Sequence, residues 1–132
     1  MDMERLNERR KGFLLALVRL EEASNAPFSS FVRDAVILRF KFTHELAMKM
    51  LQLCLEQEGI EAKSPRETWQ KALQAGLVTD GNLWSDLQKM RNLTSHTYNE
   101  KLADEVYTFI RATGLGLFQQ HAEQCRTWQP NA

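Results

Sequence analysis

The amino-acid sequence predicts an all-α protein, a bundle of four to five helices in up-and-down order. Apolar residues recur at helical spacing over most of the chain, and no alternation typical of a strand persists beyond a few residues. Residues that begin or end helices separate the apolar stretches. The chain has 132 residues, 43% of them hydrophobic and 26% charged, as in a globular protein with one core. We therefore expect a single domain over residues 1–132.

The first helix is expected from about Met3 to Ala23, with apolar side chains on one face and Glu and Arg on the other. The stretch SNAPFSS then breaks the pattern, because Pro27 lacks an amide donor and the serines offer N-caps. A second helix should therefore start near Ser29 or Ser30.

This second helix should run to about Glu58 and stop at Gly59. Its apolar residues occupy more than one stripe, which is typical of a helix that is central in a bundle or shared with a second subunit. It supplies more apolar side chains than one core readily holds, so we expect a homodimer.

The sequence Ser64-Pro65-Arg66-Glu67 combines an N-cap serine, a proline at the first helical position and a glutamate that can reach back to the cap. It predicts a short third helix that ends at Gly76. Three of its side chains should point inward: Trp69, Ala72 and Leu73.

A turn at Asp80-Gly81 precedes a fourth helix, and a last helix opens near Asn99 and runs towards the C-terminus. Gly114 and Gly116 lie in this last helix. No strand precedes them, so close packing or a kink explains them better than a nucleotide fingerprint.

Between these two helices lies a dense polar cluster, made of Arg91, Asn92, Thr94, Ser95, His96 and Tyr98. On an unbroken helix, five residues advance about 500°, so the side chains of Arg91 and His96 would point about 140° apart. We therefore expect the helix to end or bend between them.

The cluster offers chemistry for a phosphodiester. The planar fork of Arg91 suits phosphate oxygens, and His96 could take the proton of a ribose 2′-hydroxyl without a metal. Hydroxyls at Thr94, Ser95 and Tyr98 could orient the substrate. A run of Arg, Asn and Ser at a helix end is also ordinary capping chemistry, and spacing alone favours that explanation.

Three blocks of sequence resemble one known family. RNLTSHTY resembles the pattern Arg, four residues, His, one residue, Tyr of HEPN ribonucleases that are paired with minimal nucleotidyltransferases. RFKFTHELAMKMLQLCLEQEGI resembles the long second helix of the nucleotidyltransferase substrate-binding subfamily, and SPRETWQKALQAGLV resembles its following cap and short helix. Together the blocks cover about residues 34–110.

The resemblance implies a dimeric HEPN bundle with the two motifs near the shared face. It implies that Arg91 and His96 are catalytic, that Asn92 supports them, and that Tyr98 accepts AMP. In such pairs the HEPN protein is an RNA-cleaving toxin, and a nucleotidyltransferase encoded nearby neutralises it. The alternative is a noncatalytic nucleotide- or substrate-binding subunit of a two-component nucleotidyltransferase.

Other polar residues are expected to play structural parts. No carboxylate or cysteine lies at metal-binding spacing from His44, so we expect it to pack or to lie at an interface, and we expect the same of His121. We expect no metal site and no cofactor. Arg39 is a candidate phosphate contact if the second helix lines a dimer cleft. The basic run Arg9, Arg10, Lys11 is expected on a solvated face, with an RNA-guiding patch as the second option.

The charge balance and the cysteine content indicate how the protein can contact RNA and in which compartment it is found. Seventeen Lys and Arg residues balance seventeen Asp and Glu residues, so RNA contact must be local. Cys54 and Cys125 are too few for a disulfide framework, and no apolar run is long enough to span a membrane. We expect a soluble, cytoplasmic protein with reduced thiols.

Overall fold

The computed structural model describes residues 3–130, and this part of the chain contains helices and no strand. A 3₁₀ turn, Thr94–His96, follows the fourth helix, and a π-helical segment, Ile110–Gly114, joins the fifth to the sixth. The last two α-helices therefore form one rod, and residues 3–130 contain five rods, within the predicted range of four to five helices. The α-helices are α1 (Met3–Asn25), α2 (Ser30–Gln57), α3 (Pro65–Gln74), α4 (Gly81–Leu93), α5 (Glu100–Phe109) and α6 (Leu115–Thr127).

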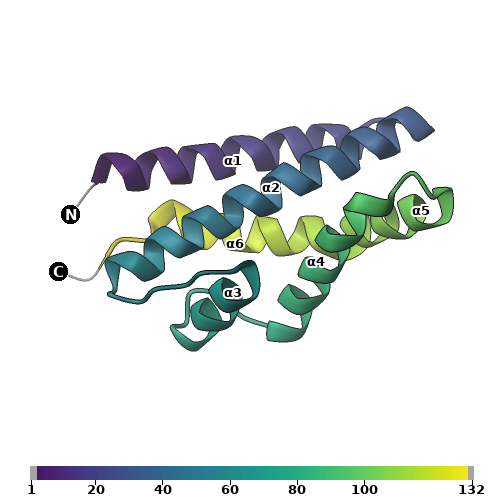
Figure 1. Ribbon diagram of the computed structural model, residues 1–132. Coiled ribbons are helices and arrows are strands. Elements are labelled where there is room, and N and C mark those ends of the chain that lie inside the picture. Colours follow the sequence, from purple (N-terminus) through teal and green to yellow (C-terminus); the bar gives the residue numbers. More distant parts are fainter. Residues whose placement is uncertain (1–2, 131–132) are drawn as a thin grey trace.

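The long rods run up and down (Figure 1). α1 packs along most of α2, and the chain reverses direction again into α4 and into the α5–α6 rod (Figure 1). Short α3 lies beside α2 and α4. The start of α1 and the end of α6 meet at one end of the bundle, where Arg10 Nε donates to the Cys125 carbonyl at 2.7 Å. Arg10 is thus half-buried and bonded, whereas a solvated face was expected.

One hydrophobic core joins all the rods. α2 contributes buried side chains along its length, from Val36 to Leu55, and packs against α1, α3, α4 and α5. This central position is what its broad apolar surface predicts. Each fully buried aromatic or aliphatic side chain contributes roughly 1.5–3 kcal/mol to stability. The largest are Phe13, Phe40, Trp84 and Phe118.

The predicted caps are present. Ser29 Oγ accepts from the Val32 amide at 3.0 Å, and Ser64 Oγ accepts from the Glu67 amide at 3.1 Å. The Glu67 carboxylate reaches one residue further back than expected, to the Lys63 amide at 3.2 Å. Gly59 and Gly76 both have φ +78°, the left-handed conformation that ends a helix.

Two expectations about α3 and the last helix need correction. Leu73 is 37% exposed, whereas Trp69 and Ala72 are buried, because one short helix turns only a narrow face to the core. The expected single last helix contains the π segment. Within it Gly114 packs closely, since an added Cβ would lie 3.4 Å from a Phe109 ring atom. An added Cβ at Gly116 would meet nothing within 4 Å.

Some features concern the chemical setting of the chain. Cys54 and Cys125 are free and buried, and burial raises the pKa of each thiol to about 12. No helix within residues 3–130 is long and apolar enough to cross a bilayer. In the same range, no three His, Cys, Asp or Glu side chains gather as ligands for a metal.

Candidate functional site

The polar motif sits where α4 ends. A 3₁₀ turn over Thr94–His96 replaces the α-helix, which confirms the predicted break between Arg91 and His96. Thr94 Oγ1 donates to the Arg91 carbonyl at 2.6 Å, and Thr97 Oγ1 donates to the Thr94 carbonyl at 3.1 Å. The Thr94 backbone N–H also donates to the Arg91 carbonyl, so these side-chain bonds add to the backbone bonds at the end of the helix.

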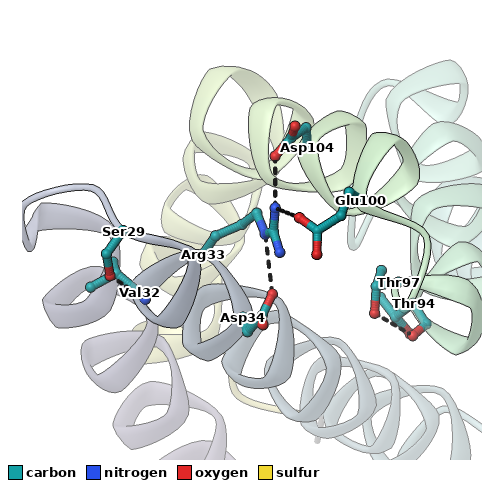
Figure 2. Close-up of polar contacts among 8 residues, drawn as sticks. All are labelled: Ser29, Val32, Arg33, Asp34, Thr94, Thr97, Glu100 and Asp104. Carbon is teal, nitrogen blue, oxygen red and sulfur yellow. Dashed lines mark hydrogen bonds and ion pairs between the residues drawn. The ribbon is translucent and has the colours of Figure 1, made fainter.

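A buried arginine on α2 binds the start of α5, the helix that follows the motif. Arg33 on α2 is 4% exposed, and its Nη1 donates to Glu100 at 2.7 Å and to Asp104 at 3.0 Å (Figure 2). Its Nε donates to Asp34 at 3.1 Å. Glu100 and Asp104 lie in the first turns of α5, directly after the motif. We call these four residues the Arg33 cluster; it ties the start of α5 to α2.

The carboxylates of the Arg33 cluster keep the Arg33 guanidinium charged. The hydrogen bonds that Arg33 donates to Glu100 and, to a lesser extent, to Asp104 raise the pKa of its guanidinium, which therefore stays charged despite its burial. Arg33 was not singled out from the sequence. The available signal was the adjacent pair Arg33 and Asp34 near the start of α2, but the two carboxylates from α5 lie more than sixty residues away.

A pocket of about 280 Å³ opens between α2 and α4, next to the motif. We call it the α2–α4 pocket. Arg91 and Asn92 of the predicted site line it, together with residues that were not assigned to a site from the sequence. Its lining comprises His44, Glu45, Met48, Lys49, Gln52, Pro65, Gln88, Arg91 and Asn92.

Arg91 has hydrogen-bonding capacity to spare. It is half-buried, its Nη1 lies 3.4 Å from Thr94 Oγ1, and no carboxylate of the described residues lies within 4 Å of it. Lys49 also lines the pocket and pairs with Glu45 at 3.5 Å.

His44 forms part of the pocket wall as a neutral group. It is 3% exposed, as expected of a packing residue, and its Nε2 has no hydrogen-bond partner among the described residues. Burial, helped by the charge of Arg91, lowers the pKa of His44 to about 4. His121, the other predicted packing histidine, is buried 3.3 Å from Cys125 Sγ, and burial lowers its pKa to about 4.

His96 and Tyr98 lie together on the surface. Their ring centroids are 6.1 Å apart at 73°, His96 is exposed, and Tyr98 is 84% exposed. Neither lines the α2–α4 pocket. Ser95 is exposed beside them, whereas the hydroxyl of buried Thr94 is occupied within the fold. The hydroxyls open to a ligand are thus those of Ser95 and Tyr98.

Arg39 lies elsewhere. Its Nη1 donates to the Arg19 carbonyl of α1 at 2.7 Å, and its guanidinium is 3.9 Å from the Glu22 carboxylate. It does not line the α2–α4 pocket. This placement between α1 and α2 gives no support to the predicted phosphate contact by Arg39.

Comparison with known protein families identifies the family of the chain. Residues 8–127 match the family model described as nucleotidyltransferase substrate binding protein like. The chain belongs to this family. The resemblance inferred from the motif, the long second helix and the third-helix cap is thereby confirmed.

Proteins of Haemophilus influenzae and Thermus thermophilus are among those similar to this chain. A probable ribonuclease HepT of Haemophilus influenzae is 36% identical over 90 residues, which cover 61% of this chain and 62% of the relative. A solved structure from Thermus thermophilus is 35% identical with a TM-score of 0.73, covering 86% of this chain and 95% of that one.

A second solved structure carries a functional description. It is HI0074 of Haemophilus influenzae, described as revealing the fold of a substrate binding domain of a nucleotidyltransferase. It is 26% identical with a TM-score of 0.68, and the match covers 96% of this chain and all of that one. The family member described here therefore shares the HI0074 fold over nearly its whole length.

Proposed function

We propose that this protein is a metal-independent endoribonuclease of HEPN type that acts as a toxin. The observation that carries the proposal is the exposed pair His96 and Tyr98, next to a turn whose Arg91 has donors to spare. The relative named a probable ribonuclease supports the same reaction class.

The chemistry follows from these groups. His96 takes the proton of a ribose 2′-hydroxyl, and the 2′-oxygen attacks the adjacent phosphorus. The bond from phosphorus to the 5′-oxygen of the next nucleotide breaks, and that oxygen takes a proton from the imidazolium or from water. The products are a 2′,3′-cyclic phosphate and a 5′-hydroxyl. The Arg91 guanidinium stabilises the charge that builds on the phosphate oxygens.

A homodimer would complete the site. Arg91 faces the α2–α4 pocket and His96 lies outside it, so a second motif at a shared face supplies the missing partner for each. Exposed apolar side chains on α1 and α2 support such an interface: Leu15, Val18, Phe31 and Leu38. Light scattering after size exclusion should give the mass of two chains, and a monomer at micromolar concentration contradicts this part of the proposal.

A minimal nucleotidyltransferase encoded nearby would neutralise the toxin by adding AMP to Tyr98. The exposed phenol attacks the α-phosphorus of ATP, an oxygen–phosphorus bond forms, and pyrophosphate leaves. The new phosphate then lies beside His96 and competes with the substrate phosphate for Arg91. Mass spectrometry after incubation with the purified transferase and ATP should locate AMP on Tyr98, with none on the Tyr98→Phe variant.

The decisive experiment is RNA cleavage by the purified chain with chelator present and no partner. The His96→Ala variant should cleave at least about 100-fold more slowly, the usual loss on removing a general base. Products of the unaltered chain should end in a cyclic phosphate. Lys101→Ala, an exposed change on α5, should leave the rate unchanged. Absence of cleavage by the unaltered chain overturns the proposal.

The second candidate is a noncatalytic substrate-binding subunit of a two-component nucleotidyltransferase. The α2–α4 pocket and the description of HI0074 favour it. It predicts that the chain binds a nucleotide and changes the activity of the transferase while leaving RNA intact. The cleavage experiment therefore separates the two candidates.

A further inference from the structure

Two glutamines in the α2–α4 pocket have side-chain amides of defined orientation. Thr68 Oγ1 donates its single proton to the Ser64 carbonyl at 2.7 Å, so it accepts from Gln52 Nε2 at 3.3 Å. The indole Nε1 of Trp69 is a donor only, so Gln88 turns its Oε1 towards it at 2.7 Å. The neighbouring hydrogen bonds therefore determine which end of each amide, oxygen or nitrogen, stays free for a ligand.

The free ends of the two amides are complementary. Gln52 keeps its carbonyl oxygen as an acceptor, and Gln88 keeps its amide nitrogen as a donor. Both side chains are half-buried and line the same pocket, one from α2 and one from α4. A ligand that fits must present a donor and an acceptor, as the hydrogen-bonding edge of every nucleobase does.

The rest of the pocket suits an aromatic ring that carries a phosphate. Met48 gives a polarisable, apolar wall for the ring. Arg91 brings a positive charge that no carboxylate of residues 3–130 pairs within 4 Å, and its guanidinium fork matches phosphate oxygens, whereas the charge of Lys49 is paired with Glu45, which also lines the pocket. The neutral imidazole of His44 adds no competing charge, and its buried Nε2 lacks a partner among the described residues. The 280 Å³ volume is near the lower end of small-molecule sites, about 300–1,000 Å³.

We propose that the α2–α4 pocket binds one nucleotide, with its base between the amides of Gln52 and Gln88 and its phosphate at Arg91. The proposal rests on the proposed function in one respect, because it makes the pocket the base-recognition part of the same RNA site. The base next to the phosphate held by Arg91 is then read by the two amides, and cleavage depends on its identity.

Binding of mononucleotides tests the site directly. The isotopically labelled chain is titrated with AMP, CMP, GMP and UMP, and with ribose 5-phosphate as a probe without a base, while NMR follows the side-chain amides. At least one mononucleotide should bind ten times more tightly than ribose 5-phosphate and shift the amide signals of Gln52 and Gln88. Equal affinities for all five probes overturn the proposal.

A matched pair of variants sharpens the test. Gln88→Glu keeps an oxygen for Trp69 and replaces the free donor with an acceptor, so affinity for the preferred mononucleotide should fall at least tenfold and the order of preference among bases should change. Gln74→Glu makes the same charge change at the exposed end of α3 and should have no effect. Equal weakening of every probe, ribose 5-phosphate included, would show an effect of charge alone and would overturn base recognition.

The outcomes separate this inference from the proposed function. Mononucleotide binding by a chain that leaves RNA intact supports the pocket and overturns the ribonuclease. Metal-independent cleavage that depends on His96, with no base preference and no response to Gln88→Glu, supports the ribonuclease and overturns the pocket.

Discussion

Two arginines, Arg91 within the polar motif and Arg33 beside the helix that follows it, use their donors in opposite ways. Arg33 is 4% exposed and bonds to three carboxylates, whereas half-buried Arg91 has a single long contact to a hydroxyl and no carboxylate within 4 Å in residues 3–130. A guanidinium carries five N–H donors. A guanidinium whose charge is neutralised within the chain stabilises the fold, and one with donors left over is available to an anionic ligand.

The largest expected effect is on activity at Arg91. If its donors serve a phosphate, Arg91→Gln should slow RNA cleavage about 100- to 1,000-fold, as removal of a transition-state donor does. Its free energy of unfolding should change by less than about 0.5 kcal/mol, because no ion pair is lost. Single-turnover cleavage and urea unfolding measure the two quantities.

Lys89→Gln is the matched control for Arg91, since it removes an exposed positive charge from the same helix. It should leave cleavage within twofold of the unaltered chain. If Arg91→Gln lowers the free energy of unfolding as much as the Arg33→Met variant described below, the contrast between the two arginines is wrong.

The second effect is on stability as pH falls. His44 and His121 have a folded pKa of about 4 against 6.5 for the free side chain, so the unfolded chain binds more protons between these values. The stability that the two neutral histidines allow is fully present above pH 6.5 and is lost as the pH falls towards 4. Between pH 7 and pH 5, each histidine should lower the free energy of unfolding by about 2 kcal/mol.

Urea unfolding across this range gives the slope for the unaltered chain and for His44→Gln. The variant removes the titrating ring beside Arg91 and should lose about half of the slope, and His121 should supply the remainder. An unchanged slope would mean that His44 is not held neutral beside Arg91.

The third effect is at Arg33 itself. Arg33→Met keeps a long apolar stem but removes three charge-assisted hydrogen bonds, so unfolding should become easier by about 1–3 kcal/mol. The loss is limited because the three carboxylate side chains are 61–75% exposed and regain water. Arg66→Met, an exposed change on α3, should cost less than about 0.5 kcal/mol by the same measurement.

The smallest effect is at Thr94, which joins Arg91 to the turn. Thr94→Val keeps the shape but removes the bond to the Arg91 carbonyl and the weak contact with its guanidinium, at a cost of about 1 kcal/mol. Thr108→Val makes the same change at an exposed position of α5 and should be neutral in thermal unfolding. Equal effects at both positions would argue against a structural role for the Thr94 hydroxyl.

Local chemistry made the helix boundaries predictable. Ser29, Ser64, Gly59 and Gly76 lie where the expected caps and stops are, because a cap depends on side chains within a few residues of it. The break after Arg91 was predictable for a related reason, since its side chain and that of His96 could not converge on an unbroken helix.

Contacts between distant segments were not predictable in the same way. The carboxylates of Glu100 and Asp104 that bind Arg33 come from α5, and the indole that orients Gln88 comes from α3. The inward placement expected of Leu73 was wrong because helical spacing does not say how wide a face the core covers. The π segment joining α5 to α6 was also missed, although Gly114 marked close packing there.

The amino-acid sequence was enough to establish the all-α class, the ends of the helices, the position of the break in the motif and the family. Each of these depends on residue periodicity, on neighbours a few positions away, or on motifs that can be compared directly. The packing of the helices was needed to show that Arg33 is paired with carboxylates of residues 3–130 and Arg91 is not, and that Gln52 and Gln88 line one pocket with opposite ends of their amides already bonded. The reason is physical: hydrogen bonding and burial of a side chain depend on which other helix packs against it.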